Sequence, residues 1–322
     1  MKVVLVTGCA GFIGFHVTKK LLENNFKVIG IDNLNSYYSI NLKKKRLNIL
    51  KNFKKFNFFK INLANFSRLY NIIHTHKIDY VLHFAAQAGV RHSLKKPKEY
   101  LKSNLVGYFN LLEILKLKKI NHIILASTSS VYGVSQKKYF KENDNTDFPI
   151  QFYAATKKSN EVISHSYSHI YKLPITVARL FTVYGPYGRP DMAYYSFAEK
   201  IIKNKEIEIY NFGKQMRDFT YIDDVVNIFI KLLKKPPLKN KNYFRILNVG
   251  KGKPDKLSDF IKYLQKYLNK KAKLKFIEAQ KGDVEYTSAS LIKLKKLINY
   301  KPKTNLNIGI KKFIKWYLQK NK

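Results

Sequence analysis

The residues most suggestive of chemistry are a tyrosine and a lysine four positions apart, Tyr153 and Lys157. On a helix this spacing puts both side chains on one face, one turn apart, so an ammonium can be held close to a phenol. Free tyrosine has a pKa of about 10, and lowering it by ~3 units takes about 4 kcal/mol of differential stabilisation. A cation beside the phenol oxygen in a dry site can supply this, which would make the tyrosine a base. The spacing alone also fits an ordinary solvated helix face, so a catalytic role for the pair depends on the neighbouring motifs.

The start of the chain predicts a turn that holds a dinucleotide. A short apolar strand at residues 2–6 is followed by Gly8, Gly11 and Gly14, and then by an amphipathic helix to about residue 23. In this order, backbone N–H groups at a helix N-terminus can bind a pyrophosphate. The spacing G-x-x-G-x-x-G differs from the usual dinucleotide fingerprint but meets the same need for close backbone approach.

Asp32 ends the second predicted strand, at residues 27–31. An acidic residue there can bind both ribose hydroxyls of an adenosine and would repel a 2′-phosphate, which favours NAD over NADP. A helix cap is the alternative interpretation of Asp32. Cys9, the only cysteine, is expected to fill a small space in the glycine turn rather than to act in redox chemistry.

Further apolar runs alternate with helical segments and predict an α/β fold with a Rossmann-type doubly wound parallel sheet. Ligands in such sheets bind at the carboxyl ends of the strands. A run of small residues follows Phe84, and a cluster of hydroxyls follows Ala126, so both loops are candidates for the binding site. The additional strands are expected near residues 56–61, 79–84, 122–127 and 174–181.

Pro186 and Pro190, with glycines between and before them, end this alternation. We expect residues 1–184 to form an NAD-binding Rossmann domain, with residues 219–250 returning to it. Residues 185–218 and 251–322 are expected to form a smaller C-terminal α/β domain.

The formal net charge of +40 raises the question of a nucleic-acid partner. Only seven of the 61 basic residues are arginine, and the lysines are spread along the whole chain. Nucleic-acid readers cluster their charge and depend on arginine for bidentate contacts. We therefore attribute the lysine excess to AT-rich codons and expect no nucleic-acid partner. The remaining arginines then mark places that need a planar guanidinium, and four lie inside motifs: Arg91, Arg179, Arg189 and Arg217.

No apolar run is long enough to span a membrane, and the first residues lead directly into a strand, so we expect neither a membrane segment nor a signal peptide. A single cysteine excludes internal disulfides and cysteine-rich metal sites, which suits a reducing cytoplasm. Two histidine pairs, His74 with His76 and His165 with His169, lack a third ligand of fitting spacing. No metal is therefore expected.

These motifs occur in the order and spacing of the extended short-chain dehydrogenase/reductase family, which the chain resembles from about residue 3 to residue 317. The resemblance is narrower within that family, where four stretches are similar to nucleotide-sugar 4-epimerases that act on UDP-glucuronate. The family motifs are the glycine turn, Asp32, Ala85-Ala86, Ser127-Thr128 and the Tyr153/Lys157 pair. The narrower stretches are residues 30–38, 87–91, 181–186 and 188–192.

The resemblance implies NAD-dependent epimerisation of UDP-glucuronate to UDP-galacturonate through a 4-keto sugar, with tightly bound NAD regenerated in each cycle. It implies a role in polysaccharide biosynthesis, a UDP-sugar site in the smaller domain, and a homodimer formed through the helical regions 97–117 and 153–171. Two alternatives remain open. The close one is a 4-epimerase of a neutral UDP-hexose, such as UDP-glucose or UDP-N-acetylglucosamine. The remote one is a non-catalytic nucleotide- or RNA-binding protein.

The same resemblance implies roles for individual residues. Tyr153 would be the base, Lys157 its partner and a ligand of the nicotinamide ribose, and Thr128 the hydroxyl near O4 of the sugar. The residues expected to bind NAD are Gly8, Gly11, Phe12, Ile13, Gly14, Asp32, Asn33, Asn62, Leu63, Phe84, Ala85, Ala86 and Lys157. Those expected to bind the UDP-sugar are Gln87, Arg91, Ser129, Ser130, Tyr153, Thr182, Arg189, Arg217 and Asp283. Among these, Arg189 and Arg217 would contact the UDP moiety, and Ser129 and Thr182 the sugar carboxylate.

Two positions, Asn62 and Tyr187, depart from the pattern of the family, and a third, Ser130, distinguishes the chain from related enzymes of other activity. Asn62 stands where an acidic residue usually meets the adenine, although its carbonyl can still accept an N6–H bond. Tyr187 replaces a common tryptophan. Ser130 stands where related dehydratases and decarboxylases carry a glutamate, so we expect the β-keto acid intermediate to keep its carboxylate.

Overall fold

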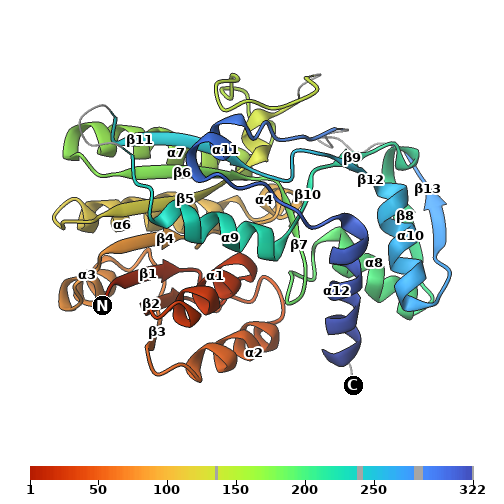
Figure 1. Ribbon diagram of the computed structural model, residues 1–322, viewed down its shortest axis with the longest axis horizontal. Helices are drawn as coiled ribbons and strands as arrows, with labels where there is room; N and C mark the ends of the chain where they lie inside the picture. The colour runs from red at the N-terminus through yellow and green to blue at the C-terminus, as the bar shows by residue number, and fades with distance from the viewer. Residues whose placement is uncertain (135–136, 238–241, 279–285, 321–322) are drawn as a thin grey trace. The chain divides into compact units, whose positions relative to one another are not determined.

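Seven strands form the central sheet of the computed structural model, which describes residues 1–134, 137–237, 242–278 and 286–320 (Figure 1). Their order is β11-β6-β5-β4-β1-β2-β3. The pairs β1–β2, β1–β4, β2–β3 and β4–β5 are parallel. Because strands are added outward on both sides of β1, the predicted doubly wound Rossmann-type sheet is confirmed. The strands are β1 (Val3–Thr7), β2 (Lys27–Asp32), β3 (Phe56–Lys60), β4 (Tyr80–His83), β5 (His122–Thr128), β6 (Ile175–Leu180) and β11 (Phe244–Val249).

Buried apolar runs explain these strands, since a sheet covered on both faces leaves no position for alternating polar residues. In β1 every residue after Val3 is buried. The register then aligns the strand ends: Thr7, at the end of β1, pairs with Ile31 on β2 and with His83 on β4. The loops that begin at Gly8 and Phe84 therefore leave the same edge of the sheet.

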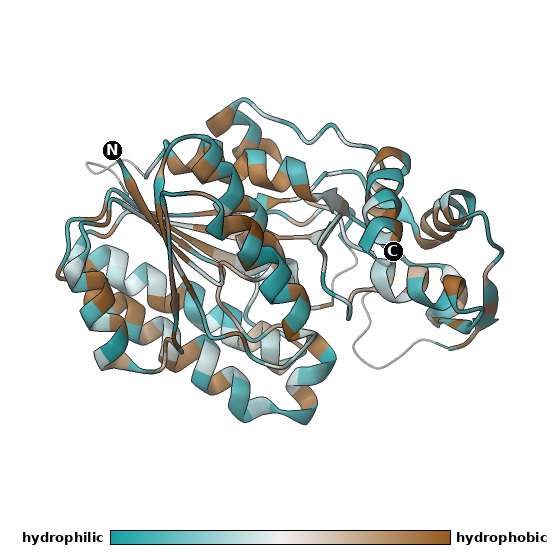
Figure 2. Cartoon of the chain, turned by 90° about the horizontal axis from the view of Figure 1, so that it is seen from below, coloured by the Kyte–Doolittle hydropathy of each residue, from teal (hydrophilic) through white to brown (hydrophobic). Residues whose placement is uncertain are grey.

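Helices cover both faces of the sheet (Figure 1). Helices α3, α6 and α7 pack on one face, where their apolar residues join the strands in one core that includes Leu5, Leu69, Leu111 and Ile123. Helices α1 and α9 lie on the other face. Figure 2 shows the strands mostly hydrophobic and the helices with both hydrophobic and hydrophilic faces. The bounds are α1 (Phe12–Glu23), α2 (Ile40–Lys51), α3 (Phe66–Thr75), α4 (Val90–Lys95), α6 (Gly107–Leu115), α7 (Phe152–Tyr171) and α9 (Ile222–Leu233).

The helical region expected at 97–117 is not uniform. It begins as α5 (Pro97–Tyr100), continues as a π-helical segment, η1 (Leu101–Val106), and ends as α6. Wider π turns inside helices are rare and often occur at functional sites. Asn104, in the middle of η1, is fully buried.

The chain divides into two compact units. The first comprises Met1–Gly133, Asn145–Arg179 and Val226–Leu247, and the second comprises Val134–Asp144, Leu180–Val225 and Asn248–Lys322. These limits differ from the expected ones in three ways. The chain leaves the first unit after residue 179 rather than 184, residues 134–144 belong to the second unit, and the segment that returns to the first unit is 226–247 rather than 219–250.

The second unit has an aromatic core. The Tyr184 ring meets those of Phe219 and Phe260, and Tyr194 meets Phe313 edge to face at 5.0 Å. Among the described residues, no helix of either unit is both long enough and apolar enough to cross a membrane. The elements of this unit are β7 (Thr182–Tyr184), α8 (Ala193–Ile202), β8 (Glu206–Ile209), β9 (Met216–Arg217), β10 (Phe219–Tyr221), β12 (Asp255–Lys256), α10 (Leu257–Leu268), β13 (Lys273–Phe276), α11 (Ile292–Ile298) and α12 (Leu306–Lys320).

Candidate active site

Tyr153 and Lys157 lie in the first turns of α7, which begins after the extended residue Gln151. Lys157 is buried, and burial lowers its pKa to about 8, although the charge of Glu161 acts in the opposite direction. Tyr153 is half-buried, and its ring meets that of Tyr100 edge to face at 6.1 Å. The helix thus holds a buried amine one turn from a phenol, as the spacing predicted.

A buried ion pair fixes this helix to the sheet. The Glu161 carboxylate accepts two bonds from Arg179, at 3.0 Å from Nε and 2.7 Å from Nη2, and one from the Ser127 hydroxyl at 2.6 Å. Burial works against the Arg179 charge, but its bonds to Glu161 outweigh that effect and raise the pKa of the guanidinium. Arg179 also lies 4.8 Å from the centroid of the Tyr132 ring. The sequence predicted that a planar guanidinium is needed at Arg179, and the structure shows this guanidinium bound to the Glu161 carboxylate.

Thr128 ends β5 and caps a short 3₁₀ turn, η2 (Ser129–Tyr132), that packs against α7. Its hydroxyl accepts the Ser130 N–H at 3.2 Å and donates to the Ser130 hydroxyl at 3.2 Å. Thr128 is buried, whereas Ser129 and Ser130 are half-buried. The hydroxyl cluster predicted after the fifth strand therefore lies at the strand end beside the helix of Tyr153.

The glycine turn leaves no room for side chains at two positions. Gly8 has φ +72°, and a Cβ there would lie 2.7 Å from the backbone nitrogen of Ala85. A Cβ on Gly14 would lie 2.1 Å from the Gly8 carbonyl oxygen. Helix α1 follows with Gly11 as its N-cap and no side-chain cap bond, so the first N–H groups of Phe12 and its successors point out of the helix end.

Asp32 is buried at the end of β2 and is not a helix cap, because the next helix begins at Ile40 with Ser39 as its N-cap. Its carboxylate accepts the Ala10 N–H at 3.1 Å and the Leu34 N–H at 2.8 Å. Burial raises the pKa of this carboxyl, while the two N–H bonds oppose that change. Each carboxylate oxygen keeps further acceptor capacity, as ribose hydroxyls would require.

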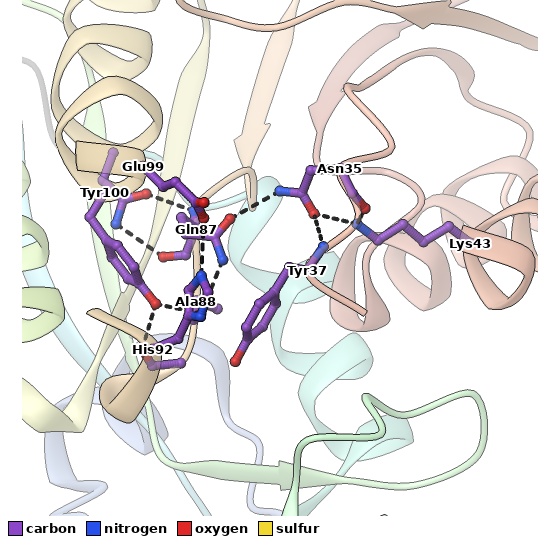
Figure 3. A network of polar contacts seen from close by, with 10 residues as sticks. Asn35, Tyr37, Lys43, Gln87, Ala88, His92, Glu99 and Tyr100 are labelled. Atoms are coloured by element: carbon purple, nitrogen blue, oxygen red, sulfur yellow. Dashed lines mark hydrogen bonds and ion pairs between the residues drawn. The ribbon is translucent and has the colours of Figure 1, made fainter. Parts of the chain in front are cut away.

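The loop after β4 is held by a polar network, which Figure 3 shows with Asn35 directed toward Gln87 and Tyr100 toward Ala88. Gln87 is buried, and its side-chain carbonyl accepts from Asn35 at 3.0 Å. Asn104 accepts the Gln87 N–H at 2.7 Å and donates to both the Gln87 carbonyl and the Thr156 hydroxyl. The network thereby connects the loops after β2 and β4 to α7.

The other predicted cofactor residues surround these loops in the first unit. The Asn62 side-chain carbonyl accepts the Ala64 N–H at 3.0 Å, and the Leu63 carbonyl accepts from Asn110. The Phe84 ring meets that of Phe229 at 4.9 Å. Ile13, Asn33, Ala85 and Ala86 are half-buried, and Arg91 is exposed on α4.

The remaining predicted substrate residues belong to the second unit. Thr182 begins β7, which pairs in parallel with β10. Arg189 makes two bonds to the Asp191 carboxylate, at 3.0 and 2.5 Å. Arg217 is half-buried in β9. Asp283 lies outside the described residues.

Several residues that organise the site were not identified from the sequence. Arg46 is fully buried and donates to the Ala10 carbonyl in the glycine turn at 2.7 Å. Asp218, beside Arg217, accepts three backbone N–H groups, those of residues 251, 252 and 289. The sequence indicates that Glu161 shares a helix face with Lys157, because the two are four residues apart, but it does not indicate that the partner of Glu161 is Arg179 on a distant strand. No local pattern identifies Asn104, whose partners Gln87 and Thr156 lie on other elements.

In the described part of the chain, no three histidine, cysteine or acidic side chains are grouped so that they could hold a metal ion.

The comparisons with known proteins agree with this geometry. Residues 4–250 match the model of the NAD dependent epimerase/dehydratase family. The UDP-glucuronate 4-epimerase of Thermodesulfobacterium geofontis is 44% identical and aligns over 97% of this chain and 95% of its own.

Two solved structures are similar over nearly their full length. The UDP-glucuronic acid 4-epimerase of Bacillus cereus, in complex with UDP-glucuronic acid and NAD, has a TM-score of 0.92 at 34% identity, covering 98% of this chain and 99% of that one. The UDP-glucose 4-epimerase of Thermotoga maritima, with UDP-glucose, has a TM-score of 0.89 at 29% identity, covering 99% and 100%. The chain therefore belongs to the NAD dependent epimerase/dehydratase family.

Proposed function

We propose that this protein is a UDP-glucuronate 4-epimerase that uses NAD. The observation that carries the proposal is the half-buried Tyr153 one helical turn from the buried Lys157, on a helix that packs against the strand end of Thr128. The similarity to the T. geofontis and B. cereus enzymes supports UDP-glucuronate as the substrate.

The residues of the first unit fit NAD. A Cβ at Gly8 or Gly14 would collide with the backbone of neighbouring residues, so the glycines allow the tight turn that leads into α1, whose first N–H groups can bind a diphosphate. Asp32 can accept from both adenosine ribose hydroxyls and would repel a 2′-phosphate. NAD held by these residues would supply a reversible acceptor for the hydride of C4, which could then return to the opposite face of the sugar.

Tyr153 moves the proton in this reaction. As a phenolate, it removes the proton from the 4-hydroxyl while the sugar becomes a ketone at C4. It returns the same proton to O4 once the hydride has come back, so no proton is gained or lost over a cycle. The Lys157 ammonium stabilises the phenolate, and the Thr128 hydroxyl donates a hydrogen bond to O4.

The loop after β5 favours epimerisation over loss of CO2. The 4-keto form of glucuronate is a β-keto acid, and its decarboxylation is aided by an acid or base near the ring. The turn η2 offers hydroxyls at Ser129 and Ser130 and no carboxyl group. We expect Ser130→Glu to raise the yield of CO2 and UDP-pentose; an unchanged product ratio would contradict this role.

For the second unit, we propose that Arg189 and Arg217 bind the UDP diphosphate, since the guanidinium fork suits phosphate oxygens. Thr182 would bind the sugar. The proposed reaction would run in the cytoplasm, as a step of polysaccharide biosynthesis.

The test is to incubate the purified protein with UDP-glucuronate and no added NAD. UDP-galacturonate should form, because the cofactor is regenerated in each cycle. Parallel incubations with UDP-glucose and UDP-N-acetylglucosamine test the neutral-hexose alternative. If NAD is shown to be bound but UDP-glucuronate is not converted, the substrate assignment is wrong; RNA binding at low salt without any turnover would favour the non-catalytic alternative.

We also propose a homodimer formed through η1, α6 and α7. Val106, Phe109, Val162 and Ile170 of these helices are 46–61% exposed, and apolar side chains on neighbouring helices are well suited to meet a second copy. Val162→Lys should then convert a dimer into a monomer in sedimentation experiments. Ile292→Lys is the matched control, because Ile292 is 73% exposed on α11, outside this surface. A wild-type monomer would exclude the proposed dimer.

A further inference from the structure

Two buried side chains near Lys157 have polar atoms without partners. His83 Nε2 and both amide atoms of Asn160 are fully buried, and they form no hydrogen bond with any group in the described part of the chain. Buried polar atoms in folded proteins are nearly always satisfied by protein or by ordered water. The lack of hydrogen-bond partners at His83 Nε2 and at the Asn160 amide therefore needs an explanation.

A chain of contacts links His83 to Asn160 on the helix of Lys157. The His83 ring packs on the Tyr108 ring, with centroids 4.9 Å apart. The Tyr108 hydroxyl bonds to Ser164 at 2.6 Å, and Ser164 donates to the backbone carbonyl of Asn160. Asn160 follows Lys157 by one turn on the buried face of α7. Lys157 is also close enough that its charge, after the larger effect of burial, lowers the pKa of His83.

The bonds at the end of β1 assign the tautomer of His83. The Thr7 hydroxyl accepts the Ala85 N–H at 3.3 Å and lies 2.8 Å from His83 Nδ1. Within the described residues the Thr7 proton has no other acceptor, so it is donated to Nδ1. The neutral imidazole then carries its proton on Nε2, and this N–H points to the unpartnered region. A water can accept from it and donate to Asn160 Oδ1, which gives that water the partners it needs.

We propose that His83 and Asn160 are positioning residues for Lys157, acting through at least one buried water held between His83 Nε2 and the Asn160 amide. Oxygen dipoles of the water and the amide would solvate the ammonium inside the protein and keep it charged beside Tyr153. The catalytic part of this proposal rests on the proposed function, in which Lys157 stabilises the Tyr153 phenolate.

The charged and titratable groups around Lys157 do not by themselves stabilise its ammonium, so neutral dipoles are required. On its own helix Tyr153 and Glu161 lie one turn away on either side, and β4 brings His83, on whose ring Tyr108 packs, while Tyr100 packs on the Tyr153 ring. Glu161 is the only anion in this set, and Arg179 already holds it with two bonds. Burial otherwise disfavours the ammonium. Removing the dipoles should therefore lower the pKa of Lys157 further.

The kinetic test compares pH profiles of kcat with UDP-glucuronate. Activity requires the Lys157 ammonium, so it falls as pH rises through the pKa of that group. We expect Asn160→Leu and His83→Leu to move this alkaline limb to lower pH by about 0.5–1 unit with little change in KM. His83→Gln keeps an N–H donor near the position of Nε2 and should restore the limb. Ser168→Ala is the matched control, since its hydroxyl is also buried and unpartnered on α7 but lies three turns from Lys157.

The double variant His83→Leu/Asn160→Leu separates positioning from stability. Removing both orphan groups together should cost less thermal stability than the two single losses add up to, because neither side chain is left facing the site without the other; the loss of Nδ1 as acceptor for the Thr7 hydroxyl is the same in His83→Leu and in the double variant. Its alkaline limb should nevertheless stay displaced. Two results would overturn the positioning role. In one, the alkaline limb of the double variant returns to its wild-type pH when stability is partly recovered; in the other, the limb does not move in either single variant.

A measurement independent of turnover tests the site in the wild-type protein. The ¹⁵N shifts of the His83 ring, identified by their loss in His83→Gln, should report a neutral Nε2–H tautomer from pH 5 to pH 8. An Nδ1–H tautomer, or titration near the ordinary histidine pKa, overturns the proposed site whatever substrate the protein uses. This result and a failure of the epimerase assignment are therefore distinguishable.

Discussion

Replacing Lys157 by methionine should stabilise the nucleotide-free protein while abolishing turnover. Burial lowers the pKa of Lys157 from 10.5 to about 8. Between these values the unfolded chain binds more protons than the folded one, so the free energy of unfolding rises with pH across this window. Below pH 8 the full cost of burying the charge is present, and it corresponds to about 3 kcal/mol at pH 7. Methionine fills a similar space without a charge, so the variant should be more stable by up to that amount.

The assay is urea unfolding of the wild type and the variant at pH 7 and pH 9.5, after removal of nucleotide. The advantage of the variant should shrink from about 3 kcal/mol to about 1 kcal/mol between these pH values, because folded Lys157 releases its proton above pH 8 and the buried charge disappears, while the unfolded chain still keeps most of its proton at pH 9.5. Lys262→Met is the control, since Lys262 is exposed on α10. A variant that is less stable than the wild type at pH 7, or a difference that does not depend on pH, would refute the reasoning.

Three other substitutions test separate parts of the site. Tyr153→Phe should reduce kcat by about 10²–10⁴-fold while calorimetry finds NAD and UDP-glucuronate binding retained; a fully active variant would remove Tyr153 from its role. Arg179→Met should cost about 3–5 kcal/mol in denaturant unfolding, because it leaves the Glu161 carboxylate buried without its cation. Adding Glu161→Leu should recover much of that loss, and no recovery would count against a buried-charge effect. Asp32→Ser should raise the ratio of NADP to NAD affinity at least tenfold, as measured by the two Kd values, and an unchanged ratio would mean that Asp32 does not select the cofactor.

The parts of the fold that depend on local sequence could be predicted from it. The apolar run that ends at Thr7 and the glycines that follow it specify a strand, a tight turn and a helix within one short stretch. Tyr153 and Lys157 are likewise placed by one helical turn. In each case neighbouring residues in the chain are also neighbours in space, so spacing alone carries the information.

Features that depend on distant residues could not be predicted in the same way. The partner of Arg179 is Glu161, and nothing in the local sequence of either residue specifies the other. The π-helical segment around Asn104 has bonds to Gln87 and Thr156, which come from two other elements. The segment at 134–144 joins the second unit because its contacts are with distant residues; Asn248, for example, donates to the Phe140 carbonyl.

The position of Cys9 allows chemical modification of its thiol to report local opening of the glycine turn. The only thiol lies fully buried in the glycine turn, and burial raises its pKa well above the ordinary cysteine value. A thiol reagent can therefore react only when the turn opens, and mass spectrometry can time that event without any introduced label. A nucleotide bound at the turn would slow the modification, so its rate offers a direct measure of occupancy.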